Sequence, residues 1–137
     1  MKYLLVISCL LLVTDVIRAD EDIIKVLEEF VKPCAQENKI MPEELSKFND
    51  NELEGEDRAR FGCMKACMMK LTGVVVDNEI QEDKFREIMT KINDEDPDKI
   101  TAKVEIAKAC FEEVKENTDE CELAYTFIRC IDLKTPA

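Results

Sequence analysis

The apolar positions of this 137-residue chain recur every three or four residues over most of its length, with polar residues between them. Near the start, Ile23, Leu27, Phe30 and Cys34 follow this spacing. Residues spaced in this way lie on one face of an amphipathic helix. The same pattern continues and predicts six helices, at residues 21–37, 42–48, 57–71, 81–92, 97–114 and 119–132.

Several of these helices carry signals at their first turn. Pro42 and Pro97 suit the first position of a helix, because a proline there loses no hydrogen bond. Asp96 precedes Pro97 as an N-cap residue. Asp119, with Glu122 three residues later, resembles a capping box. These signals predict where the second, fifth and sixth helices begin.

The predicted fold class is all-α, with about six helices. The only strand-like run, residues 74–76, is too short to build a sheet, and the chain contains only 3 Gly and 4 Pro. Gly62 is a weak point inside the third helix. Periodicity alone does not show whether the apolar faces fill the interior or leave an apolar cavity.

The first nineteen residues predict a secretory signal peptide. Lys2 is followed by an apolar run at 3–13, and the segment ends on the small residue Ala19, where cleavage is expected. The run is too short to span a bilayer. We therefore expect a signal peptide at 1–19 and one helical domain at 20–137, secreted into an extracellular fluid.

The charge of the chain excludes two kinds of partner. It has 19 basic and 31 acidic residues, no histidine, and a net charge of −12. Removing the leader removes two basic residues and one acidic residue, which gives −13. Such a surface repels nucleic acid and anionic membranes, so no nucleic-acid binding is expected. Membrane insertion is not expected either, because no later apolar stretch approaches membrane length.

None of the candidate catalytic and metal sites in the sequence is supported. Without histidine there is no His-dependent hydrolysis and no His–zinc site. The acidic run at 50–55 resembles the start of a calcium loop, but its twelfth position is Phe61 instead of a glutamate. Cys63 and Cys67 have a spacing that metal ligands use, yet disulfides are expected in a secreted chain. We predict no enzyme activity, no cofactor and no metal.

Cys9 lies in the leader, and six cysteines remain. An even number in a small secreted chain predicts three disulfides. Cys63 and Cys67 face the same way on a helix and are poorly aimed at each other, and Cys121 and Cys130 point to opposite faces. These arguments remove several of the fifteen connectivities that six cysteines allow, and leave more than one.

The cysteines follow the pattern C-x28-C-x3-C-x42-C-x10-C-x8-C. With the leader, the acidity and the helices, this pattern resembles that of insect odorant-binding proteins of the six-cysteine pheromone/general odorant type. The resemblance covers the whole mature chain, and the x3 and x8 spacings are its strictest parts. It implies three interlocked disulfides around an internal cavity: Cys34–Cys67, Cys63–Cys121 and Cys110–Cys130.

The resemblance also implies a function. The protein would hold a small hydrophobic odorant or pheromone and carry it through aqueous lymph to an olfactory receptor at a membrane surface, as a monomer or homodimer. Tyr125 is a candidate polar anchor, with an inward-facing structural role as the alternative. The implied wall residues, for which ordinary core packing is the alternative, are Leu27, Met69, Val74, Ile88, Val104, Ala107, Phe111, Phe127, Ile128 and Ile131.

Two other functions remain open. A non-olfactory carrier of a hormone, lipid or plant compound would have the same cysteine pattern. A protein-binding disulfide domain would instead have a filled core and an exposed apolar patch. For a carrier without histidine, we expect any release of ligand in acid to depend on carboxylates, and to occur below about pH 5.

Overall fold

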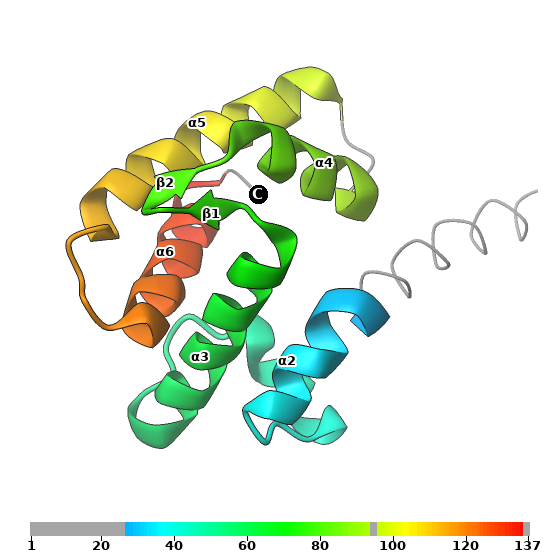
Figure 1. Ribbon diagram of the computed structural model, residues 1–137, viewed down its shortest axis with the longest axis vertical. Helices are drawn as coiled ribbons and strands as arrows, with labels where there is room; N and C mark the ends of the chain where they lie inside the picture. The colour runs from blue at the N-terminus through cyan, green and yellow to red at the C-terminus, as the bar shows by residue number, and fades with distance from the viewer. Residues whose placement is uncertain (1–26, 94–95, 136–137) are drawn as a thin grey trace, which may run out of the picture.

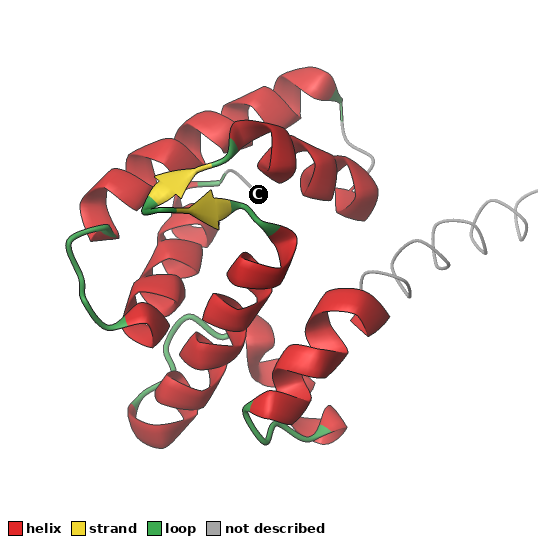
Figure 2. Ribbon diagram, viewed as in Figure 1, coloured by secondary structure: helices red, strands yellow, loops and turns green. Residues whose placement is uncertain are grey.

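The computed structural model describes residues 27–93 and 96–135 (Figure 1). The predicted leader and the first part of the first predicted helix lie outside the described residues, as do the side chains of Leu27 and residues 92–93. Helices dominate the described part of the chain, as Figure 2 shows, and the only strands described there form one short hairpin. The all-α prediction is confirmed.

The elements follow one another in the order that the periodicity predicts. In chain order, they are η1 (Leu27–Val31), α2 (Lys32–Glu37), η2 (Pro42–Asn49), α3 (Gly55–Thr72), β1 (Val75–Val76), β2 (Glu79–Ile80), α4 (Glu82–Asn93), α5 (Pro97–Val114) and α6 (Glu120–Lys134). In Figure 1, α4 and α5 lie across the top, and α2 lies beside α3 at the lower right.

The first two predicted helices differ from regular α-helices. The first passes from a π-helical turn, η1, into α2. The second, η2, is a 3₁₀ helix. Its start is tied by the backbone N–H of Met41, which donates to the Glu44 carboxylate at 3.0 Å. The guanidinium of Arg60 holds that carboxylate at 2.8 Å, and this lowers the pKa of Glu44 to about 2.

A two-stranded hairpin separates α3 from α4. β1 pairs with β2 in antiparallel register, Val75 opposite Ile80 and Val76 opposite Glu79. Asp77 and Asn78 turn the chain with φ of 51° and 62°. A two-residue hairpin turn of this kind needs positive φ at both positions, and Asp and Asn tolerate it best after glycine. The sequence analysis identified residues 74–76 as strand-like but did not predict that they pair with a second strand.

The caps agree with the sequence in part. The Asp96 carboxylate accepts a hydrogen bond from the N–H of Asp98 and caps α5. The Asp119 carboxylate accepts from the N–H of Cys121, at 3.0 Å, and of Glu122, at 3.2 Å. The Glu122 side chain does not reach back to complete the box, because it pairs with Arg58 of α3.

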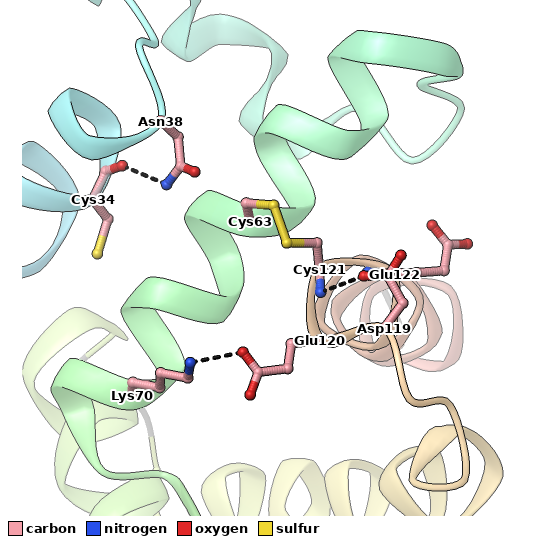
Figure 3. The surroundings of a disulfide bond; sticks show 8 residues. All are labelled: Cys34, Asn38, Cys63, Lys70, Asp119, Glu120, Cys121 and Glu122. Atoms are coloured by element: carbon pink, nitrogen blue, oxygen red, sulfur yellow. Dashed lines mark hydrogen bonds and ion pairs between the residues drawn. A yellow bond between two sulfur atoms is a disulfide. The ribbon is translucent and has the colours of Figure 1, made fainter.

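α3 and α6 form the most extensive helix pair in the described structure. They approach closely at Gly62, where a Cβ atom would lie 2.5 Å from the carbonyl oxygen of Cys121. The neighbouring disulfide joins Cys63 to Cys121 across the same crossing, with their Cα atoms 4.2 Å apart (Figure 3). Glycine at this position thus lets the two backbones come together.

The interior divides into two apolar clusters. The upper core joins the end of α3 to α4, α5 and α6, and contains Met69, Val74, Phe85, Ile100, Val104, Ala107, Cys110, Phe111, Ala124 and Phe127. The lower core joins α2 and η2 to α3 and contains Cys34, Ala35, Ile40, Leu53, Phe61, Met64 and Tyr125. α3 and α6 contribute to both.

The disulfides connect these parts. They join Cys34 to Cys67, Cys63 to Cys121 and Cys110 to Cys130, the three pairs that the resemblance implies. The first fastens α2 to α3, the second α3 to α6, and the third α5 to α6. Cross-links between distant helices restrict the unfolded chain, and each typically stabilises a fold by about 2–4 kcal/mol.

Candidate ligand-binding site

A pocket of about 460 Å³ opens beside the upper core, between the end of α3, the hairpin, α5 and the start of α6. Its walls are apolar and its mouth is polar. The walls are Ala66, Met69, Val75, Phe111, Leu123 and Ala124. The mouth is bordered by Lys70, Asp77, Asn78 and Glu120.

The Cys63–Cys121 disulfide positions two of these walls. Ala66 lies three residues after Cys63 on α3, and Ala124 lies three residues after Cys121 on α6. Residues three apart are neighbours on one helix face, so both alanines follow the bridge along the facing surfaces. Because each has only a methyl group, the two helices leave space between them at this level.

Larger side chains close the far sides of the pocket. Met69, six residues after Cys63, is 9% exposed and carries a flexible thioether that adapts to irregular shapes. Phe111 of α5 is fixed by an edge-to-face contact with Phe127, with 5.6 Å between the ring centroids. A rigid aromatic wall and an adaptable one therefore face the same space.

An ion pair lies at the mouth. The ammonium of Lys70 is 2.7 Å from the carboxylate of Glu120, and both side chains are about two-thirds exposed (Figure 3). The pair spans from α3 to α6, in parallel with the disulfide. Such an exposed pair contributes little to stability, about 0–1 kcal/mol. Its lysine is the one cationic residue among those that line the pocket.

The structure places nine of the ten predicted wall residues in or against the upper core. Six are buried in it, and three are half-buried and packed against it. The side chain of the tenth, Leu27, lies outside the described residues. Met69 and Phe111 also line the pocket. The buried residues are Met69, Val74, Val104, Ala107, Phe111 and Phe127, and the half-buried ones are Ile88, Ile128 and Ile131.

Tyr125 lies in the other cluster. Its ring is fully buried in the lower core. Its hydroxyl accepts a hydrogen bond from the N–H of Leu53 at 2.9 Å and donates one to the carbonyl of Asp50 at 3.2 Å. Both partners belong to the loop before α3, so this geometry favours the structural role over that of a polar anchor.

Sequence reasoning missed the two alanines, Val75 and Leu123 as pocket residues, and all four residues of the mouth. A signal for the alanines was present, since each follows a cysteine by three positions. The hairpin residues carried a signal for the turn itself, at Asp77 and Asn78, but none for the position of that turn over the pocket.

Two other hollows border the described structure. One, of about 630 Å³, lies between α2 and η2 against the lower core, with Val31, Ala35, Ile40 and Leu45 among its walls. The other, of about 580 Å³, lies along the hairpin and α5, and its border is mostly polar. It shares Asp77, Asn78 and Phe111 with the first pocket, so the hairpin tip separates two openings.

Among residues 27–93 and 96–135, no group of three or more Cys, Asp or Glu side chains is arranged to hold a metal ion. In the same residues, no helix is long and apolar enough to cross a membrane.

Comparison with known proteins shows which family the chain belongs to. The PBP/GOBP family model matches residues 17–133, which is most of the chain. The chain belongs to this family of insect odorant-binding proteins. Its members are binding proteins, which agrees with an apolar pocket in a disulfide-linked helical frame.

Individual relatives are more distant. Pheromone-binding protein Gp-9 of Solenopsis globularia littoralis is 25% identical over 111 residues, which cover 75% of this chain and 69% of that protein. The proteins of the same name from Solenopsis nigella gensterblumi and Solenopsis electra are each 27% identical over 78 residues, 57% of this chain and 50% of theirs. No solved structure matches the chain.

Proposed function

We propose that this odorant-binding protein is a secreted carrier of small hydrophobic ligands, which it holds in the pocket beside the upper core. The observation that carries the proposal is the apolar wall of that pocket, between two helices fixed by the Cys63–Cys121 disulfide. Pheromone binding, which the names of the Gp-9 relatives state for those proteins, supports the same class of ligand.

Desolvation supplies the affinity. An apolar ligand gains about 25 cal/mol for each Å² of its surface removed from water. Pockets for small molecules have volumes of about 300–1,000 Å³, so a hollow of about 460 Å³ accepts a ligand of this kind. The polar groups at the mouth orient the ligand, and the walls hold its apolar part.

The cargo would be an odorant or pheromone carried through aqueous lymph to a membrane receptor. A non-olfactory carrier would use the same pocket for a hormone, lipid or plant compound. Competition among panels of these compounds for one bound fluorescent probe distinguishes the two functions. Secretion needs a test of its own. The expected result is that the secreted protein begins at Asp20.

Probe binding by two matched variants tests the site. Ala66 is half-buried and lines the pocket, whereas Ala59 is exposed on the same helix and lines none of the three hollows. Ala66→Phe places a ring in the pocket and is expected to weaken binding of a fluorescent apolar probe at least tenfold. Ala59→Phe is expected to leave it unchanged. Equal binding by both variants, with native helix content, would reject this pocket.

A further inference from the structure

We propose that the mouth of the pocket selects ligands whose polar end is a cation or a hydrogen-bond donor, disfavours carboxylates, and owes this preference to Asp77. The proposal rests on the proposed function and names the chemical class of ligand for the same pocket. Its basis is which of the charged groups around the hairpin tip already have an ion-pair partner.

The cations near the tip already have carboxylate partners. Lys70, at the mouth, pairs with Glu120 at 2.7 Å. Two more lysines border the hollow on the other side of the hairpin. Lys108 pairs with Glu82, and Lys115 pairs with Glu112 at 2.7 Å. A carboxylate ligand would have to share one of these ammonium groups with the carboxylate already paired to it, and the like charge of that carboxylate opposes its binding.

Asp77 differs from these lysines because its charge is not paired in the described part of the chain. Within residues 27–93 and 96–135, its side chain makes no hydrogen bond or ion pair, although it lies exposed at the border of both openings. With Lys70 and Glu120 cancelling, Asp77 leaves the mouth a net charge of −1. The amide of Asn78 beside it adds neutral donors and an acceptor. A donor or cation on the ligand therefore meets an unengaged carboxylate.

The turn holds Asp77 in this place. Its φ of 51° lies in the left-handed region, where Asp and Asn are the best tolerated residues after glycine. Asp77→Asn therefore removes the charge and keeps the turn. An exposed charge pair typically changes an affinity by about two- to fivefold, and this is the size of effect expected from one substitution at the mouth.

Three ligands with the same apolar chain test the preference: dodecylamine, dodecanol and dodecanoic acid, competing for a fluorescent apolar probe at pH 7 and low salt. The expected order of affinity is amine, then alcohol, then acid. Raising the salt is expected to reduce the spread, because ions screen exposed charges. Native protein that binds the acid most tightly, or all three equally, overturns the inference.

Matched variants assign the preference to Asp77. Asp77→Asn is expected to lower the amine affinity and raise the acid affinity, each by about two- to fivefold. Asp83→Asn is the control, because Asp83 is exposed at the start of α4 and borders none of the three hollows. It changes the net charge by the same amount and is expected to change neither affinity. Identical behaviour of the two variants overturns the assignment.

A double variant reverses the charge of the mouth. Glu120→Gln frees the Lys70 ammonium, and together with Asp77→Asn it gives the mouth a net charge of +1. The acid is then expected to bind more tightly than the amine. An amine preference that persists overturns the inference. If the native protein binds none of the three ligands, the proposed function is overturned, and the inference with it.

Discussion

Lys65 is the most unusual residue in the described structure. Only 2% of it is exposed, and its ammonium lies 5.0 Å from the ring centroids of both Phe48 and Tyr125. Its Nζ atom has no hydrogen-bond partner among the described residues. Burial lowers the pKa of Lys65, against the opposing charges of Asp132 and Asp50. The contacts with the rings offset only part of the cost of burying a charge.

Lys65→Met is therefore expected to stabilise the protein at pH 7, by about 1–3 kcal/mol. The folded-state pKa of Lys65 lies below the unfolded value of about 10.5. The unfolded chain thus binds the proton more readily, and the destabilisation is complete below the folded-state pKa. It disappears as the pH rises toward 10.5. The advantage of the variant should therefore shrink with pH.

Urea unfolding of the native and Lys65→Met proteins between pH 7 and 10 measures the difference between their free energies of unfolding. Lys99→Met, an exposed lysine on α5, serves as the control and should show no comparable trend with pH. A Lys65→Met protein less stable than the native one at pH 7 would contradict the prediction. It would mean that the contacts between the lysine and the two rings outweigh the cost of its burial.

At the scale of elements, the crossing of α3 and α6 depends on one glycine. Gly→Ala inside a helix normally stabilises it by up to about 1 kcal/mol. At Gly62 the added methyl would meet the backbone of Cys121 at 2.5 Å, and backbone cannot move aside as a side chain can. Gly62→Ala is therefore expected to destabilise the protein by about 1–3 kcal/mol. A rise in melting temperature would contradict this account of the crossing.

The sequence predicted the helices well because each buries one face, which leaves a period of three to four residues. It predicted η2 as a helix but did not predict its 3₁₀ geometry. Periodicity also does not reveal the contacts between Met41, Glu44 and Arg60 at its start. The hairpin was missed because each strand is only two residues long. The turn residues Asp77 and Asn78 were the available signal, and they were not used.

The candidate site was predicted only in part, for a related reason. Phe111 lies on an apolar stripe of its helix, and the family pattern assigned both it and Met69 to the wall. Ala66 and Ala124 matter because they are small and line the same pocket, on two helices that a disulfide joins, and this depends on both helices together. Tyr125 lies on an inward face as expected, but which of the two cores it enters is decided by its hydrogen bonds to the loop before α3.

At the scale of the whole molecule, the chain contains no histidine, so we expect its response to acid to depend on carboxylates. The side chains that gain protons as the pH falls from 7 to 3 are then carboxylates, whose ordinary pKa values are about 4. We expect release of a bound probe to have its midpoint below about pH 5.

A fluorescence titration of the loaded protein from pH 7 to 3 measures that midpoint. Circular dichroism over the same range separates release from unfolding. A midpoint near pH 6.5, with the fold intact, would contradict a carboxylate-dependent release.

We propose that a small apolar ligand enters the pocket beside the upper core. The methionines report on it directly, because Met69 lines that pocket, while Met41 borders the hollow against the lower core and Met64 is buried within that core. Protein labelled with ¹³C at the methionine methyl groups can be titrated with dodecanol and followed by NMR. We predict intermolecular NOEs to the methyl group of Met69 and none to Met41 or Met64. NOEs to Met41 without any to Met69 would contradict the account.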